Sequence, residues 1–264
     1  MVDRGRVPPL SDVVVLPGSV EEVSQVVKLA SIYHIPVVPW GGGSGSQGGT
    51  MPMYGGIIMD MKRLNKIVEI NETDGTVTAQ GGINGYDLEC AVNEAGWTFP
   101  HYPASVHSAT LGGYLACRGS GTISTKYGKA EDMVLSVQVV LPNGDVIRTL
   151  SVPNHAAGPG ILQLFVGAEG SFGTITEATM RIERLPEVRR FRSYLFPDMH
   201  AGLEAGRRIM LNRLQPLVIR LYDERSTIKT VRRVLGTEVD RGAYMVIGFD
   251  GFEDIVAAQE RHAF

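Results

Sequence analysis

Three glycine-rich clusters constrain most strongly what this chain can fold into and bind. They span residues 41–49, 103–128 and 167–173, and each lies beside a segment whose apolar residues predict a β-strand. Glycine makes up 32 of the 264 residues, well above its usual share of about 7%. The spacing is not periodic, which excludes collagen-like and linker sequences. A backbone approaches a large ligand closely only where side chains are absent, so the clusters predict a binding site built from main chain.

The first cluster directly follows a predicted strand at residues 37–38. Small residues there let several backbone N–H groups point into one concavity, which suits a phosphate. No Lys-Ser/Thr pair follows the cluster, so it is not a Walker A loop, and its glycine spacing does not match the Rossmann fingerprint. From these residues alone, phosphate binding and a surface loop are equally good interpretations.

The remaining pattern predicts an α+β fold. Residues 13–16 are an apolar run that predicts a buried strand, and a capping box from Ser19 to Glu22 opens a helix that stops before Pro36. Residues 100–128 show little periodicity. We expect further strands at 57–59, 67–70, 76–79, 133–141, 146–149 and 174–182, hairpin turns at 71–75 and 142–145, and a helix at 87–95 ended by Gly96.

The sequence changes character at Leu185-Pro186, where glycine becomes rarer and arginine more frequent. We therefore expect two domains, 1–186 and 187–264. An α+β domain of the second length leaves one face of its sheet uncovered, so it is expected to be incomplete or to need a partner. Its elements are expected as strands at 191–195, 217–221 and 243–249, helices at 199–213 and 224–234, and the start of a final helix.

Charge and cysteine content exclude several functional classes. The net charge is −3, which gives no electrostatic footprint for nucleic acid. Met1 to Pro9 is polar, so no secretory leader is expected, and no apolar run is long enough for a transmembrane helix. Cys90 and Cys117 cannot form a disulfide framework, which favours a reducing, cytoplasmic compartment. No set of His, Asp and Glu has the spacing of metal ligands.

Together the clusters resemble a known family. In chain order the matching motifs are Pro39–Gly45, Ala104–Gly113, Arg118–Gly121, Tyr127-Gly128 and Gly167–Glu177, spread over about residues 12–185. This set is similar to the FAD-binding domain of PCMH-type (vanillyl-alcohol-oxidase-like) flavoproteins. No single motif is specific for this family, but the presence of all of them in this order is.

The resemblance implies a two-subdomain α+β FAD-binding domain, followed by part of a ferredoxin-like α+β cap domain. FAD would extend between the subdomains, with substrate at the flavin beneath the cap. Some members tether FAD through a histidine in the first loop; Gly43 and Ser44 stand there, which implies non-covalent FAD. The implied cofactor-binding residues are Pro39, Trp40, Gly41, Gly42, Gly43, Ser44, Gly45, Ser46, Pro103, Ala104, Ser105, Ala109, Thr110, Gly112, Gly113, Cys117, Arg118, Gly119, Ser120, Tyr127, Glu169, Gly170, Gly173 and Ile175.

Later motifs resemble the alkyldihydroxyacetone-phosphate synthase and FAD-linked oxidase subgroup. They are Asn154–Pro159, Phe196–Met199 and Pro216–Asp223. The resemblance implies a catalytic role for Arg220, and a guanidinium suits a phosphate or carboxylate. Pairing of Arg220 with Asp223 or with solvent explains the residue equally well. The subgroup's downstream histidine cluster and catalytic tyrosine have no counterpart in this sequence.

Other residues near these motifs have two interpretations each. His107 is a second catalytic candidate, although an exposed loop histidine is the commoner case. Cys117 beside Arg118 could gain thiolate character, although a packed small residue is the simpler reading. Trp40 and Trp97 are expected in the core or in a pocket wall. The arginines at 181–192 are expected along a solvated strand edge.

The resemblance leads to one main functional hypothesis and two alternatives. The main one is an FAD-linked oxidoreductase acting on a small anionic substrate, such as a hydroxy acid or a glycerone phosphate. The first alternative is alkylglycerone-phosphate synthase, which exchanges an ester for an ether at the flavin without net redox. The second is a non-catalytic FAD-binding subunit or fragment that acts with a partner. A homo-oligomer or a partner subunit is possible in each case.

Overall fold

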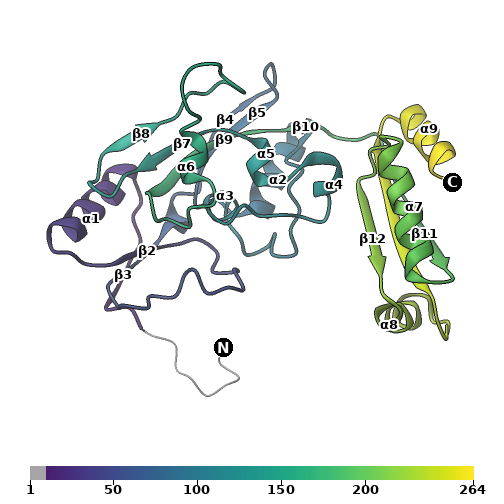
Figure 1. Cartoon of the computed structure of the whole chain (residues 1–264). Helices are drawn as coiled ribbons and strands as arrows, with labels where there is room; N and C mark the ends of the chain where they lie inside the picture. The colour runs from purple at the N-terminus through teal and green to yellow at the C-terminus, as the bar shows by residue number, and fades with distance from the viewer. Residues whose placement is uncertain (1–9) are drawn as a thin grey trace. The chain divides into compact units, whose positions relative to one another are not determined.

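The computed structural model describes residues 10–264, and its contacts divide the chain into two units (Figure 1). The polar segment Met1 to Pro9, in which no leader is expected, lies outside the described residues. The first unit runs up to Gly121 and resumes at Lys129–Arg184. The second contains Thr122–Gly128 and Leu185–Phe264. The chain therefore leaves the first unit twice.

A three-stranded parallel sheet begins the first unit, in the order β1-β3-β2. Its helix α1 starts as expected, since the Ser19 hydroxyl accepts a hydrogen bond from the Glu22 N–H at 3.2 Å. The Glu22 carboxylate accepts from Gly18 N–H rather than from Ser19. Val23 and Val27 of this helix pack against Met59 of the sheet. The bounds are β1 Val13–Val15, α1 Val20–Ile32, β2 Val37–Trp40 and β3 Ile57–Asp60.

The prediction of a buried strand at residues 13–16 is wrong in one respect. The strand forms, but Val13 is 47% exposed and Val14 is 51% exposed. β1 lies at the edge of its sheet and pairs with β3 alone. An apolar run favours a strand, but it does not show whether other elements cover both of its faces.

A five-stranded antiparallel sheet forms the other part of the first unit, in the order β4-β5-β9-β7-β8. Both predicted hairpins are confirmed, since β4 pairs with β5 and β7 pairs with β8. The predicted helix α2 is capped by Asn84 and followed by Gly96, whose φ of 82° suits glycine. The bounds are β4 Ile67–Asn71, β5 Thr76–Gln80, α2 Gly85–Glu94, β7 Val134–Val140, β8 Val146–Arg148 and β9 Thr174–Arg181; β6 Trp97–Thr98 pairs with β10 Glu183–Arg184.

Several short helices were not expected from the sequence. Residues 111–116 form α3, whose first turn is capped by the Thr110 hydroxyl. Helices of three to six residues are too short to show a periodic apolar pattern, so the sequence does not predict them. They are η2 Met61–Arg63, α3 Leu111–Ala116, α4 Ser124–Tyr127, α5 Ala130–Met133 and α6 Leu162–Phe165.

The second unit is an antiparallel sheet in the order β11-β13-β12 with helices packed on it. Ile209 of α7 and Val256 of α9 pack with Ile247 and Phe249 of β13 and form the core of this unit. Residues alternate between the faces of a strand, so Val246 and its cross-strand neighbour Arg220 lie on the opposite face. The bounds are β11 Val188–Phe196, α7 Met199–Leu211, β12 Val218–Tyr222, α8 Glu224–Leu235, β13 Ala243–Gly251 and α9 Glu253–Ala263. Across residues 10–264, no helix is both long enough and apolar enough to cross a membrane.

Candidate cofactor-binding site

The three glycine clusters converge on one cavity of about 480 Å³ within the first unit, a volume typical of small-molecule sites, which run from about 300 to 1,000 Å³. It lies where β2, α3 and the loop before β9 meet. All of the predicted cofactor-binding residues line this cavity except Ala104, Arg118 and Tyr127. Most of the residues that the sequence predicted to share one site are therefore brought together by the fold, although they are far apart in the chain.

Glycine is required where the clusters touch one another. A Cβ on Gly42 would collide with the backbone carbonyl of Ser108, and a Cβ on Gly41 would collide with the Thr110 side chain. A Cβ on Gly170 would lie 3.0 Å from Pro39. The first cluster is therefore pressed against both of the others, and a side chain at Gly42 would have to displace main chain.

The cavity offers main-chain donors rather than cationic side chains. Within the described residues, no backbone N–H from Gly42 to Ser46 donates a hydrogen bond to another protein group. In the part of the chain that the structure describes, no lysine or arginine lines the cavity, and its one charged side chain is the carboxylate of Glu169. An anion in this cavity would therefore have to be held by amide N–H groups, which the first cluster supplies.

Helix α3 and the residues after it form a tightly bonded wall of the cavity. Gly112 N–H donates to the Gly81 carbonyl at 2.7 Å, and Gly119 N–H donates to the Tyr114 carbonyl at 2.8 Å. Burial, and the nearby charge of Glu169, raise the pKa of the Cys117 thiol. The direction of this shift argues against a thiolate at Cys117.

Arg118 and Glu169 have left-handed backbones, with φ of 50° and 48°, and they join the second cluster to the third. Glu169 N–H donates to the Ala116 carbonyl at 3.1 Å, and Arg118 Nε donates to the Val166 carbonyl at 3.1 Å. Arg118 also faces Glu131, with 3.7 Å between Nη1 and Oε1. Its side chain thus fastens two loops together outside the cavity, which explains why it does not line the site.

His101 and Tyr114 form a buried polar pair beside this wall. Their rings meet edge to face with centroids 4.3 Å apart. The two ring nitrogens of His101 have no hydrogen-bond partner among the described residues. The same is true of the Tyr114 hydroxyl. Burial lowers the pKa of His101 to about 4 and raises that of Tyr114. A Cβ on the cavity residue Gly119 would lie 3.3 Å from His101 Nε2, so a neutral imidazole backs the cavity wall at that point.

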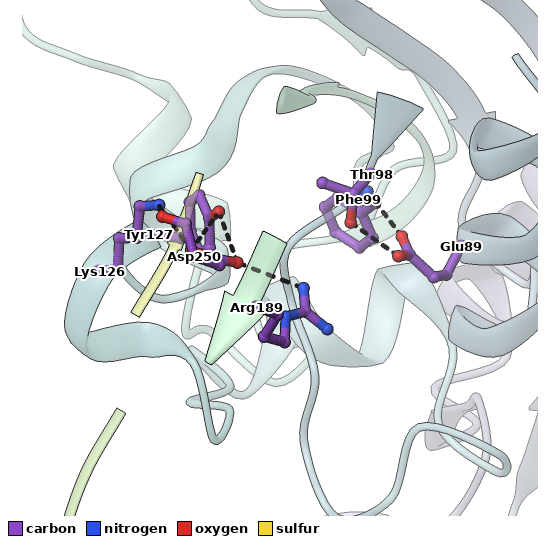
Figure 2. A network of polar contacts seen from close by, with 7 residues as sticks. All are labelled: Glu89, Thr98, Phe99, Lys126, Tyr127, Arg189 and Asp250. Atoms are coloured by element: carbon purple, nitrogen blue, oxygen red, sulfur yellow. Dashed lines mark hydrogen bonds and ion pairs between the residues drawn. The ribbon is translucent and has the colours of Figure 1, made fainter. Parts of the chain in front are cut away.

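The segment that leads into the second cluster is fixed by Glu89 of α2 (Figure 2). Its carboxylate accepts hydrogen bonds from the Thr98 hydroxyl at 2.7 Å and from the Phe99 N–H at 2.6 Å. Trp97 is buried in the same stretch, as expected, and Arg184 stacks on its ring at 4.3 Å. Trp40, the other tryptophan, lines the cavity. These contacts hold the chain at the point from which Pro103 enters the cavity wall.

Neither of the two catalytic candidates is among the described residues that line this cavity. His107 is exposed, and its ring lies against Tyr86 at a centroid distance of 4.5 Å. Arg220 belongs to the second unit and is exposed on β12. The Asp223 carboxylate caps α8 by accepting from the Ser226 N–H at 2.7 Å.

Tyr127 also belongs to the second unit, where its hydroxyl donates to the Asp250 carboxylate at 3.0 Å (Figure 2). The arginines of β11 lie on an edge strand and reach solvent, as expected, and Arg189, Arg190 and Arg192 each also form an ion pair with a carboxylate. Strand arginines and aspartates far apart in the sequence give no signal that they will pair.

Sequence reasoning missed several residues of the cavity wall. Gly81 follows β5 as the first residue of a Gly-Gly pair, the same signal that marked the three clusters. Tyr114 and Ala116 lie in the short gap between two quoted motifs. Thr174 lies within the quoted motif Gly167–Glu177 but was not singled out, whereas Met61, in the short helix η2, carries no sequence signal. The residues missed are Gln47, Gly49, Thr50, Met61, Gly81, Tyr114, Ala116 and Thr174.

These residues fit a flavin dinucleotide. A pyrophosphate needs donors without bulky side chains, which Gly42 to Ser46 supply, and an extended ligand needs the close backbone approach seen at Gly41, Gly112 and Gly170. Among the described residues that line the cavity there is no lysine or arginine that would take over this role. Nor do the described residues contain a group of three or more His, Cys, Asp or Glu side chains able to hold a metal ion.

Comparisons with known proteins agree with this geometry. The family model described as FAD binding domain matches residues 11–150, and the model described as FAD linked oxidases, C-terminal domain, matches residues 185–264. The alkyldihydroxyacetonephosphate synthase of Trypanosoma brucei brucei is 33% identical over 95% of this chain and 45% of its own length. The mitochondrial D-lactate dehydrogenase [cytochrome] of Arabidopsis thaliana is 33% identical over 92% of this chain and 43% of its own length.

A solved structure of an alkyldihydroxyacetonephosphate synthase superposes with a TM-score of 0.85 at 30% identity, covering 96% of this chain and 50% of that one. The α+β fold of this flavoprotein family, expected from the sequence, is thereby confirmed. The chain spans about half the length of the relatives it matches. Because the first family model covers more than half of the chain, this protein belongs to the FAD-binding domain family, and FAD is its cofactor.

Proposed function

We propose that this chain is the FAD-binding part of an FAD-dependent oxidoreductase that holds FAD non-covalently and acts on a small anionic hydroxy acid or glycerone phosphate. The observation that carries the proposal is the cavity of the first unit, whose free N–H groups at Gly42 to Ser46 suit a pyrophosphate. Gly43 and Ser44 have no nucleophile able to form the histidine linkage used by some flavoproteins. The bound flavin would supply the hydride acceptor.

The chain's own residues would position the cofactor and exclude water. Cys117, Gly119 and Ser120 form one wall of the cavity, and Glu169 and Gly170 form another. The neutral Cys117 thiol and the neutral His101 ring leave the first of these walls without charge. Such a wall favours the flavin ring system, while the first glycine cluster would take the negatively charged pyrophosphate.

Arg220 is proposed as the contact for the anionic group of the substrate. It lies on the sheet face opposite the core of the second unit and forms no ion pair with any described residue. A guanidinium offers a planar set of donors that matches a carboxylate or a phosphate. His107 is exposed and does not line the cavity, so we assign it no role in the chemistry.

The domain assignment belongs to the same proposal. We assign residues 1–186 to FAD binding and 187–264 to the beginning of the substrate-binding cap. The break between Arg184 and Leu185 in the contacts supports this division, although Thr122–Gly128 joins the second unit. A cytoplasmic location is also proposed, and the two free cysteines support it.

A second candidate is ester-to-ether exchange on an acylated glycerone phosphate, without net redox. Its support is the likeness to proteins named alkyldihydroxyacetonephosphate synthase, both in sequence and in fold. A third is an FAD-binding subunit that acts only with a partner polypeptide. In these two cases the bound flavin would not be reduced by a 2-hydroxy acid.

The visible absorption spectrum of the purified protein tests the proposal first. We expect a flavin band that passes into the filtrate after heat denaturation. A band that stays with the denatured protein would contradict non-covalent binding, and a protein that stays colourless after incubation with FAD would overturn the proposal.

Anaerobic titration with D-lactate and glycolate then separates the candidates. Bleaching of the flavin band by either acid supports the oxidoreductase. A bound flavin that neither acid bleaches favours the synthase or the partner-dependent subunit. The variant Arg220→Gln should need more acid for the same bleaching and keep its FAD, whereas Arg213→Gln, an exposed arginine of the same unit, serves as the matched control.

A further inference from the structure

The 122–128 loop, Thr122–Gly128, links the candidate site to the second unit through the chain itself. The residues just before it, Cys117, Gly119 and Ser120, line the cavity of the first unit. The loop groups with Leu185–Phe264, and the chain returns to the first unit at Lys129. Whatever fixes the loop therefore also fixes the end of one cavity wall.

Asp250, near the end of β13, holds the C-terminal part of this loop (Figure 2). Lys126 Nζ lies 2.6 Å from the Asp250 carboxylate and 2.6 Å from its backbone carbonyl. The Tyr127 hydroxyl lies 3.0 and 3.1 Å from the two carboxylate oxygens, and Arg189 Nη2 lies 3.3 Å from one of them. One carboxylate thus receives two consecutive side chains of the loop and one from β11.

The burial of Asp250 makes these contacts necessary rather than incidental. Its side chain has no exposed surface, and the Lys126 side chain is only 17% exposed. A buried carboxylate is tolerated only when it is paired and hydrogen-bonded, and removing one partner of such a pair is far more costly than removing an exposed pair. The loop is therefore held at Lys126 and Tyr127 with little freedom to move.

We propose that Asp250 is a positioning residue for the Cys117–Ser120 wall, so that the second unit helps to set the affinity of the first for FAD. The proposal rests on the proposed FAD-binding function. Asp250 acts through the 122–128 loop and need not touch the cofactor. The resemblance implies that Tyr127 binds FAD. In this proposal Tyr127 acts indirectly instead, because its hydrogen bond to Asp250 helps to hold the 122–128 loop.

Three variants of the full chain test this proposal. Asp250→Asn keeps the size of the side chain and removes its charge, and Tyr127→Phe removes one hydrogen bond and leaves the ion pairs intact. Glu253→Gln is the matched control, because Glu253 pairs with Arg190 in the same unit and does not touch the loop. The readouts are the dissociation constant for FAD, measured by flavin fluorescence, and the rate of trypsin cleavage after Lys126, measured by mass spectrometry.

We expect Asp250→Asn to weaken FAD binding about ten-fold, which corresponds to about 1.4 kcal/mol. Tyr127→Phe should weaken it about three-fold, in line with the loss of one hydrogen bond to a charged group. Glu253→Gln should leave the dissociation constant unchanged. Trypsin should cleave Asp250→Asn faster after Lys126, and saturation with FAD should slow this cleavage in the wild type.

Two results would overturn the proposal. One is faster cleavage of Asp250→Asn with wild-type affinity for FAD, since the loop would then be released without effect on the wall. The other is an equal loss of affinity in Asp250→Asn and Glu253→Gln, which would mean general destabilisation. If Asp250→Asn does not fold, Tyr127→Phe decides between these outcomes. A wild-type protein that binds no FAD would overturn the proposed function as well, which separates the two failures.

Discussion

The wall of the cavity and the surroundings of strand β11 in the second unit differ in how many charged side chains they contain. The wall carries one charged side chain, Glu169, and is otherwise made of backbone and small or apolar residues. Around β11, by contrast, the carboxylates of Asp250, Glu253 and Glu260 hold a lysine and three arginines.

The difference predicts different weaknesses. A site made of backbone depends on shape, so it should fail when a side chain is added, and it should change little with salt. A unit joined by ion pairs should fail when a charge is removed, and salt should weaken its exposed pairs. The predictions below test this contrast, beginning with the largest expected effect.

The largest effect should be the pH dependence that His101 gives to the first unit. Burial lowers the pKa of His101 to about 4, against about 6.5 in an unfolded chain. The folded state therefore disfavours the protonated ring, and stability that is complete above pH 6.5 is lost as the pH falls toward 4. We expect the wild type to lose about 3 kcal/mol more across this range than His101→Phe.

Urea denaturation at pH 7 and at pH 4 measures this difference. His107→Phe is the matched control, since His107 is exposed. Equal losses in the wild type and in His101→Phe would show that the buried ring does not control acid stability.

Adding one methyl group at Gly42 should break the cavity wall. The new Cβ would collide with the Ser108 carbonyl, which is main chain and cannot rotate away. We expect Gly42→Ala to lose about 2 kcal/mol of unfolding free energy, as in overpacked cores, together with FAD binding. Thermal denaturation and FAD titration measure the two effects. Gly160→Ala is the control because no atom lies within 4 Å of its Cβ, and a similar loss there would refute the shape argument.

Removing the charge of Glu260 should weaken the second unit by a smaller amount. Its carboxylate accepts from Arg190 Nη1 at 3.2 Å and from Arg192 Nε at 3.1 Å, and the residue is buried. Both arginines can still reach solvent, so we expect Glu260→Gln to cost about 1.5 kcal/mol. Chemical denaturation at low salt checks this value. A loss of FAD-binding free energy as large as the loss of unfolding free energy would contradict a purely structural role for the Glu260 ion pairs.

The smallest effect should come from the exposed pair on α7. Hydrogen bonds from Arg207, and then from Arg208, lower the pKa of Glu204 to about 2. The carboxylate therefore contributes stability above its ordinary pKa, and the contribution is lost as the pH falls toward 2. The melting temperatures of the wild type and Glu204→Gln should differ slightly at pH 7 and converge near pH 2. A difference that persists at pH 2 would mean that the charge is not its cause.

Much of the candidate site could be predicted from the sequence because glycine reports on backbone geometry. Gly41, Gly42 and Gly170 stand where a Cβ would strike a neighbouring segment or crowd it closely, so the residue type itself carries the information. Arg118 and Tyr127 were predicted in the site and lie outside its lining, because a motif marks a segment and does not show where each side chain points. His101 was passed over, although it backs the cavity wall at Gly119.

By itself the sequence determined every strand except the two-residue strands β6 and β10, the two hairpins, the longer helices and the glycine-built cavity. Each of these depends on local propensity or on a residue type that a single backbone geometry requires. Only the tertiary structure decided the exposure of β1, the pairing of β11 arginines with Glu253 and Glu260, and the attachment of the 122–128 loop to Asp250. These features join residues up to 124 positions apart. Contacts at such separations depend on how sheets and helices pack, and no local pattern in the chain records that packing.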